Sequence, residues 1–333
     1  MLHILLPVLV IAAPISSEES QVSAVFRNSK KLDARIGNGL AYLASHQSRD
    51  GSWGGGAYAR NVGITGLCVM AFLSNGDLPG EGKYSNQVSL GLGYLIRSTR
   101  RDGYITNEGA NMYAHGFAAL SLAEAYGVSP KFPALGEKLR DAIGLIVRTQ
   151  KPDGGWRYTP NRLNVSDLSV TVCQLQALRA ARNVGIKVPK QTINRAVDYI
   201  SKCANPNGTF RYMPEQRGFS LAMTCAAVTA LYVTGDYHSE ILVNGIEYLL
   251  NYAGRGIRRH NYFYYAHYYG AQAMFQAGGK YWKAWYPKIR DDLVRRQRGD
   301  GSWKGDEVGP AFGTAMALIV LQIPKQYLPI FQR

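Results

Sequence analysis

The stretch that decides the fold is Gln47–Trp53, which reads QSRDGSW. It returns as QKPDGGW at Gln150–Trp156 and as QRGDGSW at Gln297–Trp303. In each copy the glycine suits a turn with positive φ, and the aspartate can bond the local backbone. We expect the glutamine to tie down a helix end and the tryptophan to pack against a neighbouring unit. The motif residues are therefore interpreted as structural.

Weaker copies of the turn fill the gaps between the three complete ones. They lie at Asp102-Gly103-Tyr104 and at Asn207–Phe210, and a fifth unit keeps only Arg255-Gly256. Successive turns are separated by 52, 51, 54, 48 and 45 residues. A period of this size is typical of repeat architectures. The chain of 333 residues therefore contains six units of about fifty residues each.

Two kinds of helix alternate with the turns. Before the fourth turn, Ile193, Ala196 and Ile200 recur at helical spacing with polar residues between them, which predicts a half-exposed helix. After the turns come stretches that are apolar nearly all round, such as residues 117–123 and 311–321, which must be buried on every side. Six such helix pairs can bury the apolar helices and expose the polar faces of the others if the apolar helices form an inner ring inside an outer ring. We predict an all-α, single (α/α)6 toroid, closed so that neither end of the array needs a polar cap.

The start of the chain predicts export. Residues 1–17 have the apolar core and polar exit of a signal peptide, are too short to span a bilayer, and lack the usual leading Lys or Arg. We assign residues 18–33 to a linker and residues 34–333 to the toroid, in a periplasmic or extracellular protein that could also be membrane-associated. A retained N-terminal anchor or a disordered tail is the alternative.

Charge and cysteine content limit the partners. Lys and Arg outnumber Asp and Glu by 38 to 23, a net charge of +15, which favours phosphates, an anionic membrane surface or acidic partners. No basic stretch carries a nucleic-acid signature, so we expect no nucleic acid partner. Four cysteines without a CxxC pair indicate neither a disulfide scaffold nor a zinc finger. We expect no cofactor and no metal, and the protein partner is unknown.

The turns resemble the QW repeats of the squalene cyclase and protein prenyltransferase β-subunit superfamily, which includes compact bacterial proteins with prenyltransferase and squalene oxidase repeats. The resemblance covers residues 34 to 323 and implies a terpenoid cyclase-like toroid that handles an isoprenoid. The chemistry of the family is degenerate here. The resemblance aligns its D-x-D-D acid sequence with Asn164-Val165-Ser166-Asp167, where only the last acid remains. The zinc-binding Asp-x-Cys pair becomes Asp167-Leu168-Ser169, without the thiolate, and the Cys-Gly-Glu-Gln thioester sequence of complement-like toroids is absent.

Three titratable residues share a frame when residues are counted from each turn. His115, Asp167 and His267 follow their turn by 13, 14 and 12 residues, so we predict that they meet at one mouth of the ring as a catalytic acid and two bases. Each also has a structural interpretation: a buried histidine with hydrogen bonds, or an N-cap for the helix that begins at Leu168.

Other residues are grouped with this site as hypotheses. Substrate-lining aromatics are predicted at Tyr113, Tyr264, Tyr265 and Tyr268, where the alternative is ordinary packing. A phosphate-binding cluster is considered at Arg157, Arg162, Arg211 and Arg217, with a solvated basic rim as the alternative. Cysteines at matched depth, Cys68, Cys173 and Cys225, are interpreted mainly as small buried side chains, with a metal cluster as the alternative.

Two functions of different class remain open. The first is an isoprenoid or other lipid held in a central apolar cavity, with or without turnover. The second is a noncatalytic envelope scaffold that binds protein or polysaccharide. Attachment to a membrane surface through Arg255, Arg258, Arg259 and the aromatics Tyr262–Tyr269 is compatible with either. A deep cavity favours the first function, and a filled centre favours the second.

Overall fold

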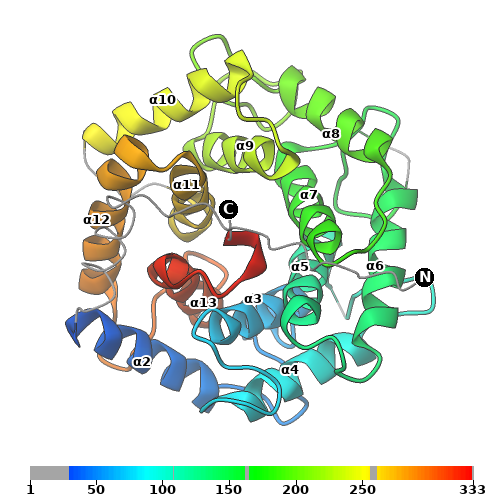
Figure 1. Ribbon diagram of the computed structural model, residues 1–333, viewed down its shortest axis with the longest axis vertical. Coiled ribbons are helices and arrows are strands. Elements are labelled where there is room, and N and C mark those ends of the chain that lie inside the picture. The colour runs from blue at the N-terminus through cyan, green and yellow to red at the C-terminus, as the bar shows by residue number, and fades with distance from the viewer. Residues whose placement is uncertain (1–29, 108, 162–164, 256–260, 332–333) are drawn as a thin grey trace, which may run out of the picture.

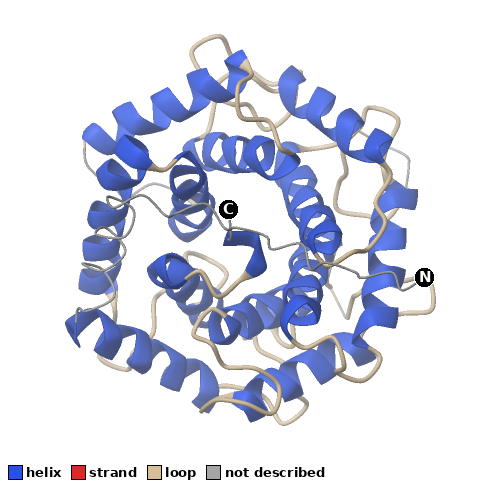
Figure 2. Cartoon of the chain, in the orientation of Figure 1, coloured by secondary structure: helices blue, strands red, loops and turns tan. Residues whose placement is uncertain are grey.

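The structure is a computed structural model that describes residues 30–107, 109–161, 165–255 and 261–331. Twelve α-helices of this part of the chain form two concentric rings (Figure 1). Figure 2 shows helices joined by loops, with no strand among the residues it describes. The predicted all-α (α/α)6 toroid is confirmed. The predicted signal peptide, residues 1–17, and the linker residues 18–29 lie outside the described residues.

The outer ring consists of helices that bury one face. In α8, Ile193, Ala196 and Ile200 are buried while Asn194 and Asp198 are exposed, as the periodicity predicted. Their polar faces leave the perimeter of the ring in contact with solvent. The outer helices are α2 (Lys30–Ser45), α4 (Ser85–Arg97), α6 (Leu135–Thr149), α8 (Lys190–Lys202), α10 (Glu240–Gly254) and α12 (Gly279–Arg296).

The inner ring consists of helices that are buried almost throughout; every residue of α3 is buried. Small residues let these helices approach closely: a Cβ on Gly66 would lie 2.9 Å from the Phe117 carbonyl oxygen, and one on Gly116 would lie 2.9 Å from Cys173 Cβ. The inner helices are α3 (Val62–Leu73), α5 (Met112–Val128), α7 (Leu168–Asn183), α9 (Leu221–Thr234), α11 (Phe263–Ala277) and α13 (Pro310–Gln322).

Each complete turn is bonded to the next outer helix. Gln150 Nε2 donates to the carbonyl oxygen of Gly154 at 2.7 Å and to that of Thr192 in α8 at 2.8 Å. Gly154 has a φ of 101°, and a Cβ on it would lie 2.1 Å from the carbonyl oxygen of Arg195, also in α8. Trp156 Nε1 donates to the Ile146 carbonyl of the preceding outer helix at 2.8 Å. The turn therefore holds two successive outer helices together.

The same contacts close the ring. Gln297 Nε2 donates to the Arg35 carbonyl of α2 at 2.8 Å, and a Cβ on Gly301 would lie 2.5 Å from the Asn38 carbonyl oxygen. The last inner helix, α13, packs against α2 and α3. Unit six thus meets unit one through the contacts that join units in the middle of the chain. No helix within the described residues is long and apolar enough to cross a membrane.

Candidate functional site

A hydrogen bond between turn and inner helix sets a common register. In four units the N–H of the turn's aromatic residue donates to a threonine hydroxyl at 3.0 to 3.1 Å. In unit two the donor is the Ile105 N–H and the acceptor is His115 Nδ1, at 3.1 Å. His115 therefore takes the place of a threonine. The four donor and acceptor pairs are Trp53 with Thr65, Trp156 with Thr171, Phe210 with Thr224, and Trp303 with Thr314.

His115 lies between α5 and its own turn. Its ring is fully buried, with its centroid 5.6 Å from that of Tyr104. Burial lowers the pKa of the imidazole from 6.5 to about 4, so the ring is neutral at physiological pH. A neutral ring whose Nδ1 accepts from a backbone N–H anchors the degenerate turn.

His267 and Asp167 lie apart from His115. The His267 ring packs between two aromatic rings. Its centroid is 4.5 Å from that of Phe263 and 5.4 Å from that of Trp285 in the outer helix α12. Asp167 is the N-cap of α7: its Oδ1 accepts from the Val170 N–H at 2.9 Å and from the Ser169 hydroxyl at 2.7 Å. The contacts described for these side chains place them in three separate environments, so a shared catalytic role remains a prediction.

The loops between the turns and the inner helices differ in length from unit to unit. Five units have the hydrogen bond between turn and inner helix. In them the donor in the turn and the acceptor on the inner helix are 12, 10, 15, 14 and 11 residues apart in the sequence. Asp167 lies four residues before Thr171, and the matching positions in units one and two are Asn61 and Asn111, which also cap their helices. The threonine register, visible in the sequence, would have placed Asp167 with these caps.

Asp167 nevertheless has an unusual carboxyl group. It is completely buried, and burial raises its pKa against the lowering effect of its two hydrogen bonds. Its Oδ2 has no hydrogen-bond partner among the described residues. Its charge acts on Tyr113, Tyr265 and Cys173, whose pKa values are raised mainly by burial. The carboxyl therefore lies beside the aromatic side chains that approach the axis.

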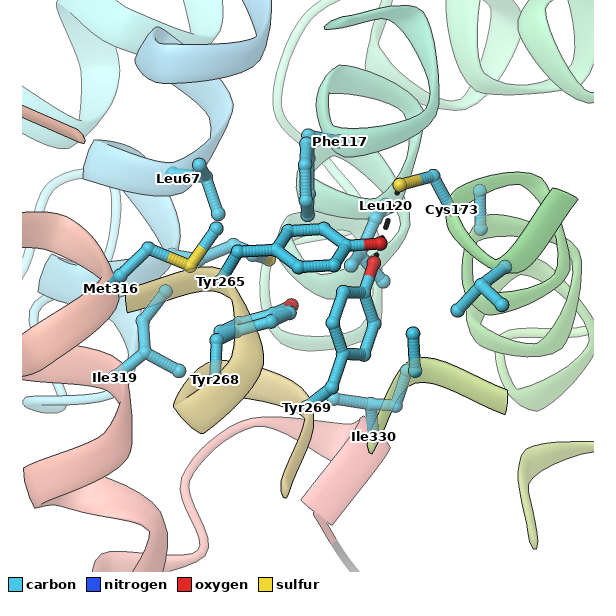
Figure 3. Packing of buried hydrophobic residues seen from close by; sticks show 14 of the residues in the cluster. Leu67, Phe117, Leu120, Cys173, Tyr265, Tyr268, Tyr269, Met316, Ile319 and Ile330 are labelled. Atoms are coloured by element: carbon cyan, nitrogen blue, oxygen red, sulfur yellow. Dashed lines mark hydrogen bonds between the residues drawn. The ribbon is translucent and has the colours of Figure 1, made fainter. Parts of the chain in front are cut away.

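Aromatic side chains fill the axis of the ring. Figure 3 shows Tyr265, Tyr268 and Tyr269 of α11 converging with Phe117 of α5 and Cys173 of α7. The ring of Tyr269 lies 4.7 Å from that of Tyr265 and 4.9 Å from that of Tyr268, and Phe117 lies 6.0 Å from Tyr268. The Cys173 thiol and the Tyr269 hydroxyl share a hydrogen bond of 3.2 Å. The centre is packed with interlocking side chains.

The predicted substrate-lining tyrosines divide into two groups. Tyr265 and Tyr268 face the axis, and the ring of Tyr113 lies 6.0 Å from that of Tyr265. Tyr264 differs: its backbone N–H donates to Asp306 Oδ2 at 3.2 Å, beside the loop of unit six. Three of the four therefore share the axial cluster, which also includes Tyr269.

The hollows described in this structure lie away from that cluster. A groove of about 410 Å³ is lined by Pro79 and by residues 129–132, between the α3–α4 and α5–α6 loops. A hollow of about 50 Å³ lies where Leu32, Tyr286 and Lys325 meet. Neither is lined by the axial tyrosines, and Tyr265, Tyr268 and Tyr269 are themselves buried.

Exposed aromatics instead occupy the loops that lead into the inner helices, at the end of the ring called here the N-terminal mouth. Phe219 and Tyr262 are 57% and 66% exposed, and Tyr58 and Tyr158 are exposed as well. They precede α9, α11, α3 and α7 respectively. Sequence reasoning missed Tyr58, Tyr158 and Phe219, although each is an isolated aromatic between a turn and an apolar helix. They belong to separate units and share one mouth.

Hydrogen bonds join neighbouring loops of this mouth. Asn107 Nδ2 donates to the Arg60 carbonyl, linking units one and two. The Met112 N–H donates to the Tyr158 carbonyl at 2.9 Å, linking units two and three. The hydroxyls of Tyr158 and Tyr212 are 2.6 Å apart, linking units three and four. These bonds join the loops of units one to four into one stretch of the rim.

The predicted arginine cluster is partly used in structural contacts. Arg211 Nη2 donates to the Lys202 carbonyl at 2.8 Å, at the end of α8. Arg157 lies over the Tyr158 ring at 5.6 Å. Arg217 is exposed on the rim. Arg162, Arg258 and Arg259 lie outside the described residues, so the proposed phosphate and membrane contacts of these three side chains have no structural description.

The cysteines are free and buried. In the threonine register Cys68, Cys173 and Cys225 lie three, two and one residues after their threonine, so they face different directions. Cys68 Sγ approaches the Ala311 carbonyl of α13, and Cys225 lies against Gly270 of α11. Among the described residues no group of three His, Cys, Asp or Glu side chains is arranged to hold a metal ion.

Comparisons with known proteins identify the fold. No family model and no curated protein sequence matches this chain. Type II terpene cyclase MstE from Scytonema, in complex with its product merosterolic acid A, is 16% identical, with a TM-score of 0.62 over 89% of this chain and 97% of that one. An inactive variant of an α-1,6-mannanase from Salegentibacter sp. HEL1_6, in complex with α-1,6-mannotriose, is 8% identical, with a TM-score of 0.68 over 89% of this chain and 99% of that one.

These likenesses confirm the resemblance at the level of fold. They also separate fold from chemistry, because a terpene cyclase and a glycoside-cleaving enzyme match this chain about equally well. The chain has the (α/α)6 toroid fold, which the terpene cyclase and the mannanase share.

Proposed function

We propose that this protein is an exported, noncatalytic binding protein that holds a polysaccharide at the N-terminal mouth. The observation that carries the proposal is the contrast between a packed axis and a rim of exposed aromatic side chains. A lipid chain would have to displace Tyr265, Tyr268 and Tyr269 from the centre of the fold. A polymer that lies across the mouth displaces only water.

The chemistry of the rim suits a sugar chain. Exposed aromatic side chains that recur over a surface mark an interaction site. Tyr58, Phe219 and Tyr262 offer flat apolar faces for the C–H faces of pyranose rings, and tyrosine hydroxyls can bond sugar hydroxyls. The side chain of Arg217 is exposed on the same rim and adds donors for an acidic sugar. Arg60 is exposed there too, but its Nε is paired with Asp50 Oδ2 at 2.8 Å. The mannotriose complex of the mannanase shows that this fold serves a glycan ligand in another protein.

Affinity electrophoresis through gels that contain soluble polysaccharides tests this proposal. The probes are α-1,6-linked mannan, mixed-linkage β-glucan and alginate. We expect one of them to retard the protein, and we expect Phe219→Ala and Tyr262→Ala to weaken retardation roughly tenfold together. Tyr237→Ala is the matched control, because Tyr237 is 51% exposed but lies in the loop between α9 and α10, at the opposite mouth.

The outcomes separate the candidate partners. Equal loss in the Tyr237 control would show that retardation does not depend on the rim. No retardation by any polysaccharide, together with sedimentation on phosphatidylglycerol vesicles that requires Phe219 and Tyr262, would replace the glycan with an anionic membrane surface. Either result contradicts the proposal.

Asp167 supports a second candidate, the acid-initiated isomerisation or cyclisation of an isoprenoid. A buried carboxyl with a raised pKa and an unbonded Oδ2 can hold a proton next to an aromatic cluster that would stabilise a cation. Such a reaction is redox-neutral: the carboxyl protonates an alkene, and a later deprotonation returns the proton. It requires the axial tyrosines to move, because the described side chains fill the axis.

Turnover is tested by incubating the protein with geranylgeraniol and with squalene and analysing the extracts by gas chromatography and mass spectrometry. Products isomeric with the substrate that disappear in Asp167→Asn would favour this second candidate. Asn at an N-cap preserves the helix, so a folded Asp167→Asn protein is the proper comparison. Unchanged substrate with both proteins leaves the binding function as the one supported.

A further inference from the structure

The C-terminal segment crosses the opposite end of the ring. After α13 the chain forms the short helix η2 (Ile323–Lys325) and reverses at Gln326, whose φ is 54°. Tyr327 passes Gly76 at the end of α3, and the short helix η3 (Pro329–Phe331) reaches α5 and α7. Figure 1 shows the last described residues, in red, near the centre of the ring. The last described residues therefore close the C-terminal mouth.

This segment is held mainly by apolar burial. Leu328, Ile330 and Phe331 are buried, and Figure 3 shows Ile330 beside Tyr269 at the axis. A Cβ on Gly127 would lie 3.2 Å from Pro329 Cγ, so α5 approaches the segment closely. Three buried apolar side chains on so short a segment make it a plug, with the axial aromatics directly behind it.

A single buried acid bonds the backbone of the plug. The Ile330 N–H donates to Glu124 Oε2 at 3.2 Å. Glu124 lies in α5 and is completely buried, and its Oε1 has no hydrogen-bond partner among the described residues. Burial raises the pKa of Glu124 from 4.5 to about 8, and the Ile330 N–H partly opposes that rise. The carboxyl is thus held in its neutral form at physiological pH.

We propose that Glu124 is a latch for the C-terminal plug, which is closed while this carboxyl is protonated and is released when the carboxyl ionises. In the closed state one N–H bond does not offset the cost of burying the ionised carboxylate. Release of the plug lets water solvate that charge. The released state uncovers the axial aromatics Tyr268 and Tyr269. The latch gives the toroid a second, conditional opening, distinct from the rim at the N-terminal mouth.

Among the described residues, the groups that face Glu124 do not offset its charge. From α11 comes Tyr268, on which the charge of Glu124 acts. From the C-cap of α7 comes Val184, which with Pro329 of the plug approaches Gly127 one turn further along α5. The plug itself presents Ile330 and Phe331. The cation of η2, Lys325, is instead bonded to Asn75 Oδ1 at 2.8 Å.

The direction of the pH effect follows from linkage. Glu124 has an ordinary pKa of 4.5 when solvated and about 8 when the plug is closed, so opening releases a proton between these values. Closure is therefore strongest below pH 4.5, weakens as the pH rises, and stays weak above about pH 8. From about pH 5.5 to about pH 7.5 the opening equilibrium should rise roughly tenfold or more.

Hydrogen exchange with mass spectrometry on the full chain tests the latch. The readout is the protection factor of the C-terminal peptide that contains Ile330, which corrects for the intrinsic pH dependence of exchange. We expect protection to fall roughly tenfold or more between about pH 5.5 and about pH 7.5 in the natural protein. In Glu124→Gln, which keeps an acceptor but cannot ionise, protection should be the same at both values. Peptides from α3 serve as the internal control.

Three results would overturn the proposal. The first is protection of the plug that does not change with pH in the natural protein. The second is a fall of equal size in Glu124→Gln. The third is a parallel fall in the α3 peptides, which would indicate global loosening. If Glu124→Gln fails to fold, Ile330→Ala provides the second route: a plug closed by this segment should lose protection at both pH values while α3 stays protected.

Discussion

The contacts at the turns repeat around the ring, whereas the side chains along its axis differ from unit to unit. At the turns the same contacts recur: Gln150 and Gln297 bond the next outer helix, and Gly154 and Gly301 leave no room for a Cβ against it. Along the axis the units differ, with Phe117 from unit two, Cys173 from unit three and a group of tyrosines from unit five. Repeated contacts define the perimeter of this fold, whereas the side chains along the axis do not repeat from unit to unit.

The difference teaches where function can vary without loss of the fold. A terpene cyclase and a mannanase share this toroid, so its perimeter does not depend on one chemistry. In this chain the axis is packed, and the variable loops at the N-terminal mouth expose aromatics. Changes at turns should therefore affect stability, and changes at the rim should affect binding alone.

The largest effect is expected at a motif glycine. Gly154→Ala places a Cβ 2.1 Å from the Arg195 carbonyl oxygen at a φ of 101°, so the turn must separate from α8. We expect a loss of about 4 kcal/mol in the free energy of unfolding. Urea denaturation followed by circular dichroism measures it. Gly55→Ala is the control, because a Cβ there meets nothing within 4 Å, and it should change stability by less than about 0.5 kcal/mol.

Unit two differs from units one, three, four and six because His115 replaces the threonine that bonds the turn. We therefore expect the free energy of unfolding to decrease at acid pH. The pKa of His115 is about 4 in the folded protein against an ordinary 6.5, so the unfolded chain binds the extra proton as the pH falls between these values. Stability should decrease by up to about 3 kcal/mol over that range. His115→Thr, which restores the residue used in other units, should remove this component of the pH dependence. Equal acid sensitivity in both proteins would contradict the assignment.

A smaller effect is expected at the threonine that accepts the turn's N–H. Thr171→Val keeps the shape but leaves the buried Trp156 N–H without its acceptor, which should cost about 1 to 3 kcal/mol. Thr171→Ser keeps the hydroxyl and should retain most of that stability. Thermal unfolding of the two variants side by side distinguishes the hydrogen bond from simple packing. Equal losses would mean that the methyl group matters more than the hydroxyl.

The smallest effect on stability is expected at the rim. Phe219 is 57% exposed, so Phe219→Ala should change the free energy of unfolding by less than about 0.5 kcal/mol. A larger loss would show that the rim is a structural element and would weaken its assignment as a binding surface. Measured beside Gly154→Ala, this variant tests the separation between perimeter and mouth.

Much of the fold could be predicted from local patterns. The QxxDGxW turns fixed the number of units, and the periodicity of Ile193, Ala196 and Ile200 separated outer from inner helices, because both signals lie within a few residues. The site was harder to predict. Counting from the turns predicts that His115, Asp167 and His267 meet, but the loops differ in length and the contacts described for the three side chains are different. A register based on the threonine that bonds the turn identifies Asp167 as an N-cap and His115 as the acceptor of the turn's N–H.

The sequence alone determined a closed six-unit helical ring, because each unit carries its own helix periodicity and its own turn chemistry. Only the tertiary structure decided which side chains meet at the axis, which loops present aromatics at the N-terminal mouth, and that Leu328, Ile330 and Phe331 close the other mouth against Glu124. Those contacts join residues far apart in the chain, and Ile330 and Glu124 are separated by 206 positions. No local pattern carries such pairings, because they depend on how all six units close around one axis.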